Sequence, residues 1–76
     1  MFIRPRGDAI AVARIKQGLS QRALAHKANL SNSYIAMIEN RIRYPSPRAA
    51  RKICEALQKP FDELFEIVGD DRVLAG

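Results

Sequence analysis

The chain has 76 residues, which is enough for one small domain and leaves little material for a substrate pocket. No apolar run is long enough to cross a bilayer, and the first residues do not have the pattern of a secretion signal. The single cysteine, Cys54, cannot form an internal disulfide, and no cysteine and histidine set has metal-ligand spacing. We therefore expect a soluble helical domain in a reducing cytoplasm, with no metal, cofactor, small-molecule ligand or membrane partner.

Charge is distributed unevenly along the chain. The 13 basic and 8 acidic residues give a net charge of +5. Residues 1–52 hold eleven of the basic and two of the acidic residues, a net charge of +9, whereas residues 53–76 have a net charge of −4. A cationic front on a small domain is typical of nucleic-acid binders, although ribosomal and membrane-surface domains share it.

The first two expected elements are an arm and a helix. Residues 1–7 contain a proline and a glycine among basic residues and predict an arm that is mobile unless docked. A helix is expected from Asp8, a suitable N-cap, to about Gln17, because the glycine that follows favours a helix end. Val12 and Ile15 lie off the inward face of this helix, so they are either covered by the arm or left for a partner.

The next two helices are expected to form a helix-turn-helix unit. Ser20 and Ser31 are good N-caps, and each precedes an unbroken helical stretch, QRALAHKA and then NSYIAMIEN. Asn29 lies in the short turn between them, where it tolerates a left-handed backbone. This arrangement leaves no room for a strand.

The remaining elements complete an expected all-α fold of five helices. A loop, RIRYPSPR, follows the third helix because its two prolines cannot lie inside a helix. Ser46 is expected to cap a fourth helix that begins at Pro47, and Pro60 opens a short fifth helix, FDELFEIV. Residues 69–76 are expected to be a tail, which leaves residues 8–68 as the helix-turn-helix domain.

The third helix has one face that packing alone does not explain. At about 100° per residue, Ile35 and Ile38 point toward the core. The opposite face is small, polar or flexible and uncharged, where a solvated face would carry lysine and glutamate. Such side chains suit a nucleic-acid groove, because asparagine pairs with adenine and alanine or methionine contacts a thymine methyl. The residues of this face are Asn32, Ser33, Ala36, Met37 and Asn40.

Cations surround this face. Arg41 and Arg43 follow it, three more basic residues lie on the fourth helix, and Arg22 lies on the second. This pattern fits duplex binding, in which phosphate contacts position the protein and base contacts specify the sequence. The helix N-terminus capped by Ser31 also suits a phosphate, and so does the Tyr34 hydroxyl. The alternative is that the face is a packing or dimer surface.

Over about residues 8–66, the sequence resembles the helix-turn-helix family of Cro and the lambda-type phage repressors, the XRE-like group. The matching pieces are LSQ, LAHKANLS, SYIAMIEN, the YPS loop and ALQKPFDELF, in order. The resemblance implies a five-helix, sequence-specific DNA-binding domain of a transcriptional repressor. Such a protein is bacterial or phage-encoded, acts on the nucleoid, and binds an inverted-repeat operator in double-stranded DNA as a homodimer.

The resemblance also implies roles for residues at matching positions. The implied base-reading residues are Asn32, Ser33, Ala36 and Met37. With Gln21 as the implied phosphate clamp, the expected phosphate-binding residues are Gln21, Arg22, Ser31, Tyr34, Asn40, Arg41 and Arg43. The family pairs an arginine of the first helix with the glutamate of the IEN segment, which here would join Arg14 to Glu39 and neutralise an acid near phosphates.

The sequence departs from the family pattern near the turns. Asn29 and Arg41 replace two glycines, one in the helix-turn-helix and one after the glutamate–asparagine pair. Gln58 replaces the glycine before the fifth helix, and Pro60 replaces its serine cap, so this junction and the dimer geometry are expected to differ.

The sequence leaves other functions open. An antitoxin or a restriction-modification controller uses the same domain at this size. A protein-interaction module with this fold would carry acids on the recognition face, and none precedes Glu39 there. No enzyme and no catalytic residue are expected, because paired carboxylates, a nucleophile–base set and a glycine-rich phosphate loop are missing. The chain is either a minimal protein or a fragment, and its acidic end either dimerises through Phe65, Ile67 and Val68 or folds back.

Overall fold

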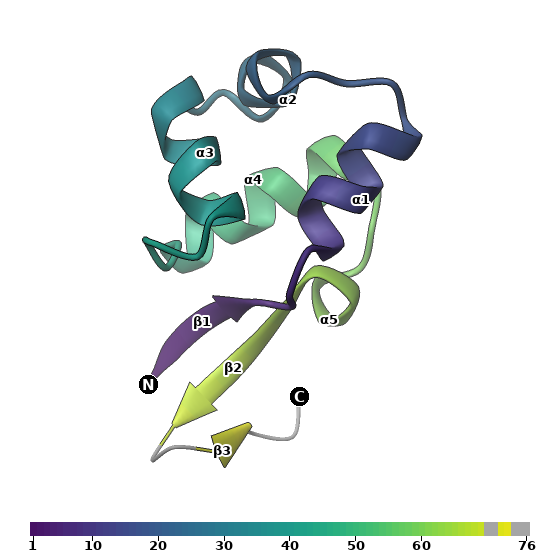
Figure 1. Cartoon of the computed structure of the whole chain (residues 1–76). Helices are drawn as coiled ribbons and strands as arrows, with labels where there is room; N and C mark the ends of the chain where they lie inside the picture. Colours follow the sequence, from purple (N-terminus) through teal and green to yellow (C-terminus); the bar gives the residue numbers. More distant parts are fainter. Residues whose placement is uncertain (70–71, 74–76) are drawn as a thin grey trace.

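A computed structural model shows a mostly helical domain with a small sheet (Figure 1). It describes residues 1–69 and the backbone of residues 72–73. Within these residues the helices are α1 (Ala9–Lys16), α2 (Gln21–Ala28), α3 (Asn32–Glu39), α4 (Pro47–Leu57) and α5 (Phe61–Leu64). The strands are β1 (Phe2–Pro5), β2 (Phe65–Gly69) and β3 (Arg72–Val73), and they form one antiparallel sheet in the order β1-β2-β3.

Serine caps set the starts of three helices. The hydroxyl oxygens of Ser20, Ser31 and Ser46 each accept a hydrogen bond from the backbone N–H three residues later, at 3.0, 3.0 and 3.1 Å. These bonds satisfy donors that the first helical turn leaves unpaired. The three serine caps predicted from the sequence are therefore confirmed. Asp8 stands at the N-cap of α1 but makes no side-chain cap bond.

Three non-glycine residues have left-handed backbone angles. Asn29, Arg41 and Gln58 have φ values of 56°, 58° and 54°, and they are the residues that replace family glycines. Asn29 and Gln58 end α2 and α4, and their N–H groups bond to carbonyls of the preceding turn. Each such residue costs roughly 1–2 kcal/mol compared with a right-handed conformation. These three turns are therefore formed without glycine.

The core joins all five helices. α2 packs against both α3 and α4, so the helix-turn-helix unit rests on α4. Gln17 Nε2 donates to the carbonyl of Leu57 at 2.7 Å, which ties the end of α1 to the end of α4. The largest fully buried side chains are Leu24, Ile35, Ile38, Ile53, Leu57, Leu64 and Phe65.

The expected all-α fold is wrong at both ends of the domain, where the chain forms strands. β1 lies inside the segment expected to be a free arm, and β3 lies inside the expected tail. The fifth helix ends at Leu64. From Phe65 the backbone is extended and forms β2 instead of continuing the helix. β1 and β2 pair with Phe2 opposite Val68 and Pro5 opposite Phe65. Residues 70–71 and 74–76 of the expected tail lie outside the described residues.

Side-chain chemistry explains why the strands pair. β2 is rich in aromatic and β-branched residues, which favour strands. Glu66 of β2 lies 2.7 Å from the guanidinium of Arg4 and 3.2 Å from that of Arg6. Phe65 and Val68 are buried. β2 therefore folds back onto the domain, and these two residues are not an exposed dimer surface.

Candidate nucleic-acid interface

The outward direction of α3 is set by its buried side. Ile35 and Ile38 are fully buried, and α3 packs against α2 through the short turn between them. The N–H of Leu30 in this turn donates to the carbonyl of Ala25 at 2.9 Å. Figure 1 shows α3 on one side of the molecule, with α1 and α5 on the other. The face opposite the two isoleucines therefore points to solvent.

That outward face carries the predicted base-reading residues. Asn32 and Ser33 are exposed, and Ala36 and Met37 are half-buried. Asn40 is the exposed C-cap of α3. Within the described residues, no hydrogen bond or ion pair engages these side chains. The structure therefore brings all five residues to one uncharged surface, which we call the recognition face.

The acid nearest to the recognition face is neutralised inside the protein. Arg14 of α1 binds Glu39 at the end of α3 through two hydrogen bonds, Nε to Oε2 at 2.7 Å and Nη2 to Oε1 at 3.1 Å. A third guanidinium nitrogen donates to the carbonyl of Leu19 at 2.8 Å. The Arg14 and Glu39 side chains are only 13% and 5% exposed. This pair joins α1 to α3 and keeps a free carboxylate away from the surface.

Gln21 is attached to the same ion pair. Its Nε2 donates to Oε1 of Glu39 at 3.1 Å. The sequence predicts Gln21 as a phosphate contact, and the structure places its amide nitrogen against a carboxylate instead. The bond fixes the first residue of α2 relative to the last residue of α3. Sequence reasoning missed this contact because the two residues are 18 positions apart.

Arg41 links the end of α3 to the start of α1. Its Nη1 donates to the carbonyl of Gly7 at 2.9 Å and lies 3.2 Å from Oδ1 of Asp8. Both side chains of this ion pair are substantially exposed, so the pair contributes little to stability. The expected phosphate contact at Arg41 is therefore occupied by protein groups in this structure, through a contact that the sequence pattern did not indicate.

A shallow basic cleft of about 500 Å³ lies beside α3. Tyr34 lines it, and the guanidinium carbon of Arg43 lies 5.1 Å from the centre of the Tyr34 ring. Arg48 and Lys52 of α4 line the same cleft. Sequence reasoning named Tyr34 and Arg43 as phosphate contacts and counted the other two only among the cations that surround the recognition face. Their separation of four residues on a helix is the signal that places them on one face.

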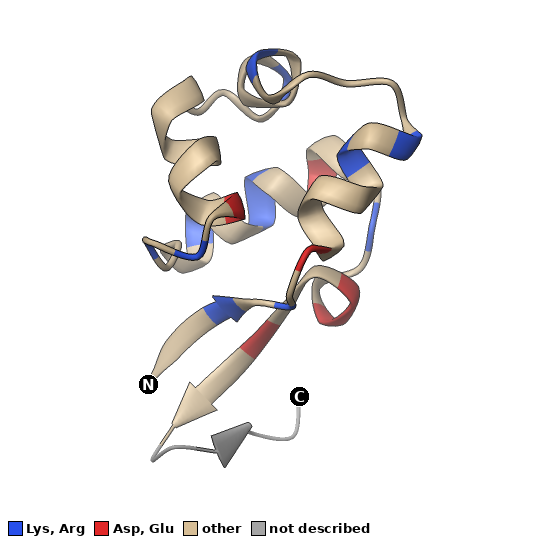
Figure 2. Cartoon of the chain, in the orientation of Figure 1, with Lys and Arg blue, Asp and Glu red and all other residues tan. Residues whose placement is uncertain are grey.

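Charge is separated across the molecule. Figure 2 shows basic residues on α2, α4 and the loop after α3, and also on α1 and β1, while acidic residues lie on α5 and β2 and, beyond these, before α1, at the end of α3 and near the end of α4. Arg22 is exposed in the first turn of α2, and Ser31 caps α3 at its exposed N-terminal end. Three of the basic elements, α2, α4 and the loop after α3, surround α3. The resulting positive potential favours the approach of a polyanion to the recognition face.

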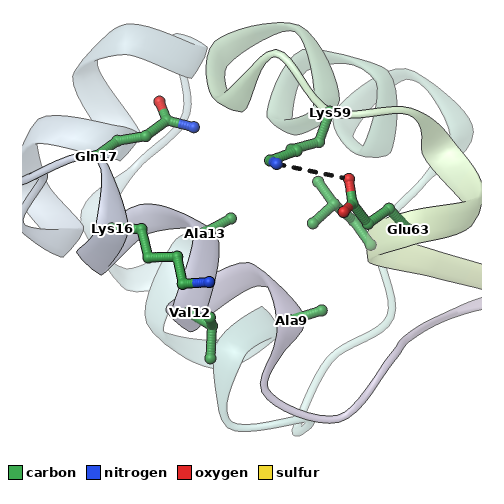
Figure 3. A pocket seen from close by; sticks show the side chains of 8 residues that line it. Ala9, Val12, Ala13, Lys16, Gln17, Lys59 and Glu63 are labelled. Carbon is green, nitrogen blue, oxygen red and sulfur yellow. Dashed lines mark ion pairs between the residues drawn. The ribbon is translucent and has the colours of Figure 1, made fainter.

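A smaller cleft of about 240 Å³ lies between α1 and the α4–α5 junction. Figure 3 shows Lys59 and Glu63 facing Val12 and Lys16 across it, with Lys59 Nζ 3.8 Å from Glu63 Oε2. Among the residues that the structure describes, no group of three or more His, Cys, Asp or Glu is placed to hold a metal ion. No helix of this part of the chain has the length and apolar character needed to span a membrane.

The fold and the recognition face define a helix-turn-helix protein. A family model described as helix-turn-helix matches residues 10–64, which is more than half of the chain. The chain belongs to this family, in its XRE-type group.

The chain is similar to a transcriptional regulator. The transcriptional regulator ClgR from Mycobacterium tuberculosis is 33% identical over 64 residues, which are 84% of this chain and 57% of that protein. The chain therefore spans little more than half the length of this curated relative.

Two solved structures show a similar fold. The restriction-modification controller protein C.AhdI from Aeromonas hydrophila has a TM-score of 0.71 and 32% identity, covering 75% of this chain and 86% of that one. The clp gene regulator ClgR from C. glutamicum has a TM-score of 0.68 and covers 75% of this chain and 74% of that one. At 24% identity, the second likeness shows the fold alone.

Proposed function

We propose that the protein is a cytoplasmic transcriptional regulator that binds double-stranded DNA at specific sequences. In this proposal α3 enters the major groove and its N-terminal residues contact base edges. The proposed base-reading residues are Asn32, Ser33, Ala36 and Met37. The proposed phosphate contacts are Gln21, Arg22, Ser31, Tyr34, Asn40, Arg41 and Arg43, and residues 8–68 are the proposed DNA-binding domain. Gln21 and Arg41 contact Glu39 and Asp8 in this structure, so in this proposal DNA binding exchanges those two contacts for phosphates.

One observation carries this proposal. The recognition face of α3 is uncharged and points outward, while the nearby Glu39 carboxylate is held by Arg14 at 2.7 Å. An ordinary solvated helix face would carry charged residues of both signs. Side chains that are short and neutral bring a helix close to base edges, and the surrounding cations suit phosphates. This combination supports DNA binding over a role as an enzyme or as a protein-interaction module.

We further propose that the protein is a repressor that binds an inverted repeat as a homodimer. Helix-turn-helix dimers place their recognition helices in major grooves about 34 Å apart, one helical turn along the duplex. Two half-sites with that spacing are therefore expected. Occupying a promoter in this way would exclude polymerase, which is a repressor mechanism that the family resemblance suggests.

Selection of bound duplexes from a random pool, followed by sizing of the complex, tests the proposal. We expect a consensus with two-fold symmetry and two protein chains per duplex. An asymmetric consensus with one chain per duplex would retain DNA binding and contradict the dimer. A pool that shows no enrichment would contradict sequence-specific binding and leave the protein-interaction module as the better interpretation.

A restriction-modification controller is a second candidate within the same class. The likeness to C.AhdI favours it, because the match covers 86% of that chain at 32% identity. Genes for a restriction endonuclease and a methyltransferase beside this gene would support this candidate. A neighbouring toxin gene would instead indicate an antitoxin.

A further inference from the structure

We infer that Phe2, the first residue of β1, is a positioning residue that holds Arg43 in place for DNA binding. The Phe2 ring stacks on Tyr44, which lies beside Arg43 in the loop of residues 41–46 between α3 and α4. In this inference β1 supports that loop and does not itself touch the duplex. The inference rests on the proposed function, in which Arg43 is a phosphate contact.

The loop has little support from its own backbone. Residues 41–44 are exposed one after another. The N–H of Ile42 donates to the carbonyl of Met37 at 2.9 Å, which ties the first part of the loop to α3. Between described residues, the N–H of Tyr44 makes no backbone hydrogen bond, and Pro45 has no N–H to donate. The position of the second part of the loop therefore depends on side-chain contacts.

The stack between Phe2 and Tyr44 is such a contact. The ring centroids lie 4.6 Å apart and the ring planes differ by 21°, which is a favourable geometry for an aromatic pair. Phe2 also lines an apolar groove together with Pro45 and Pro47. Figure 1 shows β1 running below the loop that follows α3. The first residue of the chain's first strand therefore packs against the second part of the loop.

Phe2 is itself held by the sheet. β1 pairs with β2, and Phe2 lies opposite the buried Val68. Arg4 and Arg6 both form ion pairs with Glu66, at 2.7 and 3.2 Å. A basic arm that follows a DNA groove offers its cations to the duplex, whereas these two are bound by the protein. β1 is therefore a fixed support and not an arm that reaches for DNA.

The contacts of Tyr44 lead to the recognition helix. The guanidinium carbon of Arg43 lies 5.1 Å from the centre of the Tyr34 ring, within the range of a cation–π contact. Tyr34, Arg43 and Tyr44 line the same basic cleft beside α3. A displacement of Tyr44 would therefore move the adjacent Arg43 away from Tyr34 and from the phosphate that it is proposed to bind.

The stack differs from the second contact between β1 and the loop region. Arg41 Nη1 donates to the carbonyl of Gly7 at 2.9 Å and lies 3.2 Å from Oδ1 of Asp8. In the proposed function, Arg41 exchanges the Asp8 contact for a phosphate. The stack has no charged group to exchange, so it supports the loop in the free and in the DNA-bound protein.

Binding to a selected and a scrambled duplex, over a series of salt concentrations, tests the inference. Phe2→Ala removes the ring and should weaken binding to both duplexes about fivefold near physiological salt, with a loss of about one unit of salt slope. Phe2→Tyr keeps the stack and should bind like the wild type. Ile15→Ala, which removes an exposed apolar side chain of α1, should also leave affinity and salt slope unchanged.

Circular dichroism melting separates positioning from a purely structural role. A structural role alone would lower the melting temperature and leave the salt slope of the folded protein unchanged, and that result for Phe2→Ala would overturn the inference. Phe2→Leu fills the groove but cannot stack, so it should reproduce the loss of salt slope even if the alanine variant fails to fold.

A double variant shows whether Phe2 acts through Arg43. Phe2→Ala combined with Arg43→Gln should have the affinity and salt slope of Arg43→Gln alone, because the cation that the ring positions is already missing. Additive losses would overturn the inference.

Nuclear magnetic resonance spectra recorded without DNA test the transmission by itself. Phe2→Ala should shift the ring signals of Tyr34, because Arg43 moves off that ring, and Phe2→Tyr should leave them in place. Unchanged Tyr34 signals in the folded alanine and leucine variants would overturn the inference, whatever the protein binds. A folded wild-type chain that binds neither duplex would instead overturn the proposed function, and with it the role of the stack in DNA binding.

Discussion

Asn32 is the residue whose change tests base reading most directly. It is exposed at the first position of α3, where its amide is suited to adenine. Asn32→Ala should cost about 1–3 kcal/mol on a selected duplex and relax the preference at one base pair. Arg43→Gln should instead weaken all duplexes alike and reduce the salt slope by about one unit. Fluorescence anisotropy on selected and random duplexes measures both, and equal losses from Asn32→Ala would contradict base reading.

Glu39 tests the internal ion pair. Its carboxylate is 5% exposed and receives bonds from both Arg14 and Gln21. Glu39→Gln should lower the free energy of unfolding by about 3 kcal/mol, because it leaves the Arg14 charge without its partner. Urea denaturation measures this loss. In the double variant with Arg14→Met, the loss should be smaller than the sum of the two single losses, and strict additivity would contradict the pairing.

The pKa of the Cys54 thiol tests whether this side chain of α4 is shielded from water. Burial, with a smaller effect from the charge of Glu55, raises the pKa of the Cys54 thiol. The folded state therefore holds the thiol proton more tightly than the unfolded chain does. The resulting contribution to stability is complete below the unfolded pKa and is lost as pH rises through the folded pKa. Alkylation by iodoacetamide should accelerate at higher pH in the folded protein than in urea, and identical pH profiles would contradict the shift.

At the scale of elements, a substitution at the end of α4 measures how much free energy a left-handed turn costs the folded protein. Gln58 has φ of 54° and an exposed side chain. Gln58→Gly should raise the free energy of unfolding by about 0.5–1 kcal/mol, because relief of the left-handed strain exceeds the added flexibility of the unfolded chain. Thermal and urea denaturation measure the change. Gln58→Ala is the control and should give no comparable gain, and destabilisation by Gln58→Gly would contradict this view of the turn.

Most helices were predictable because their signals are local. Serine caps, a proline at the start of α4 and apolar spacing all lie within a few residues of the elements that they define. The strands were missed for the opposite reason. Arg4 and Glu66, which pair across β1 and β2, are 62 residues apart. The spacing of Phe61, Leu64 and Phe65 also fits a helix, so local pattern alone favoured a longer α5.

In the candidate site, too, the features set by local sequence were predictable and the contacts between distant residues were not. The recognition face is defined by the angular positions of residues around a single helix, and these positions can be worked out from the sequence alone. The resemblance to a family suggested the Arg14–Glu39 pair, and the structure places those groups 2.7 Å apart. The bond from Gln21 to Glu39 and the contact of Arg41 with Gly7 depend on how separate elements pack. No local pattern indicates contacts of that kind.

At the scale of the whole molecule, charge and shape serve different parts of the proposed function. Basic residues of α2, α4 and the loop after α3 surround α3, and three of the acidic residues lie on α5 and β2, away from the recognition face (Figure 2). Such a field attracts any duplex, because phosphate contacts release counterions regardless of sequence. Preference for one sequence must come from the uncharged recognition face. Varying the salt concentration separates the affinity that comes from phosphate contacts from the preference that comes from the recognition face.

Equilibrium binding to a selected duplex and to a scrambled duplex of the same length, over a series of salt concentrations, tests this claim most directly. Affinity for the scrambled duplex should fall steeply with salt, because it depends on phosphate contacts. The selected duplex should stay preferred by at least about 10³-fold throughout. Equal affinities for the two duplexes, or a preference that disappears as salt rises, would contradict base reading by α3.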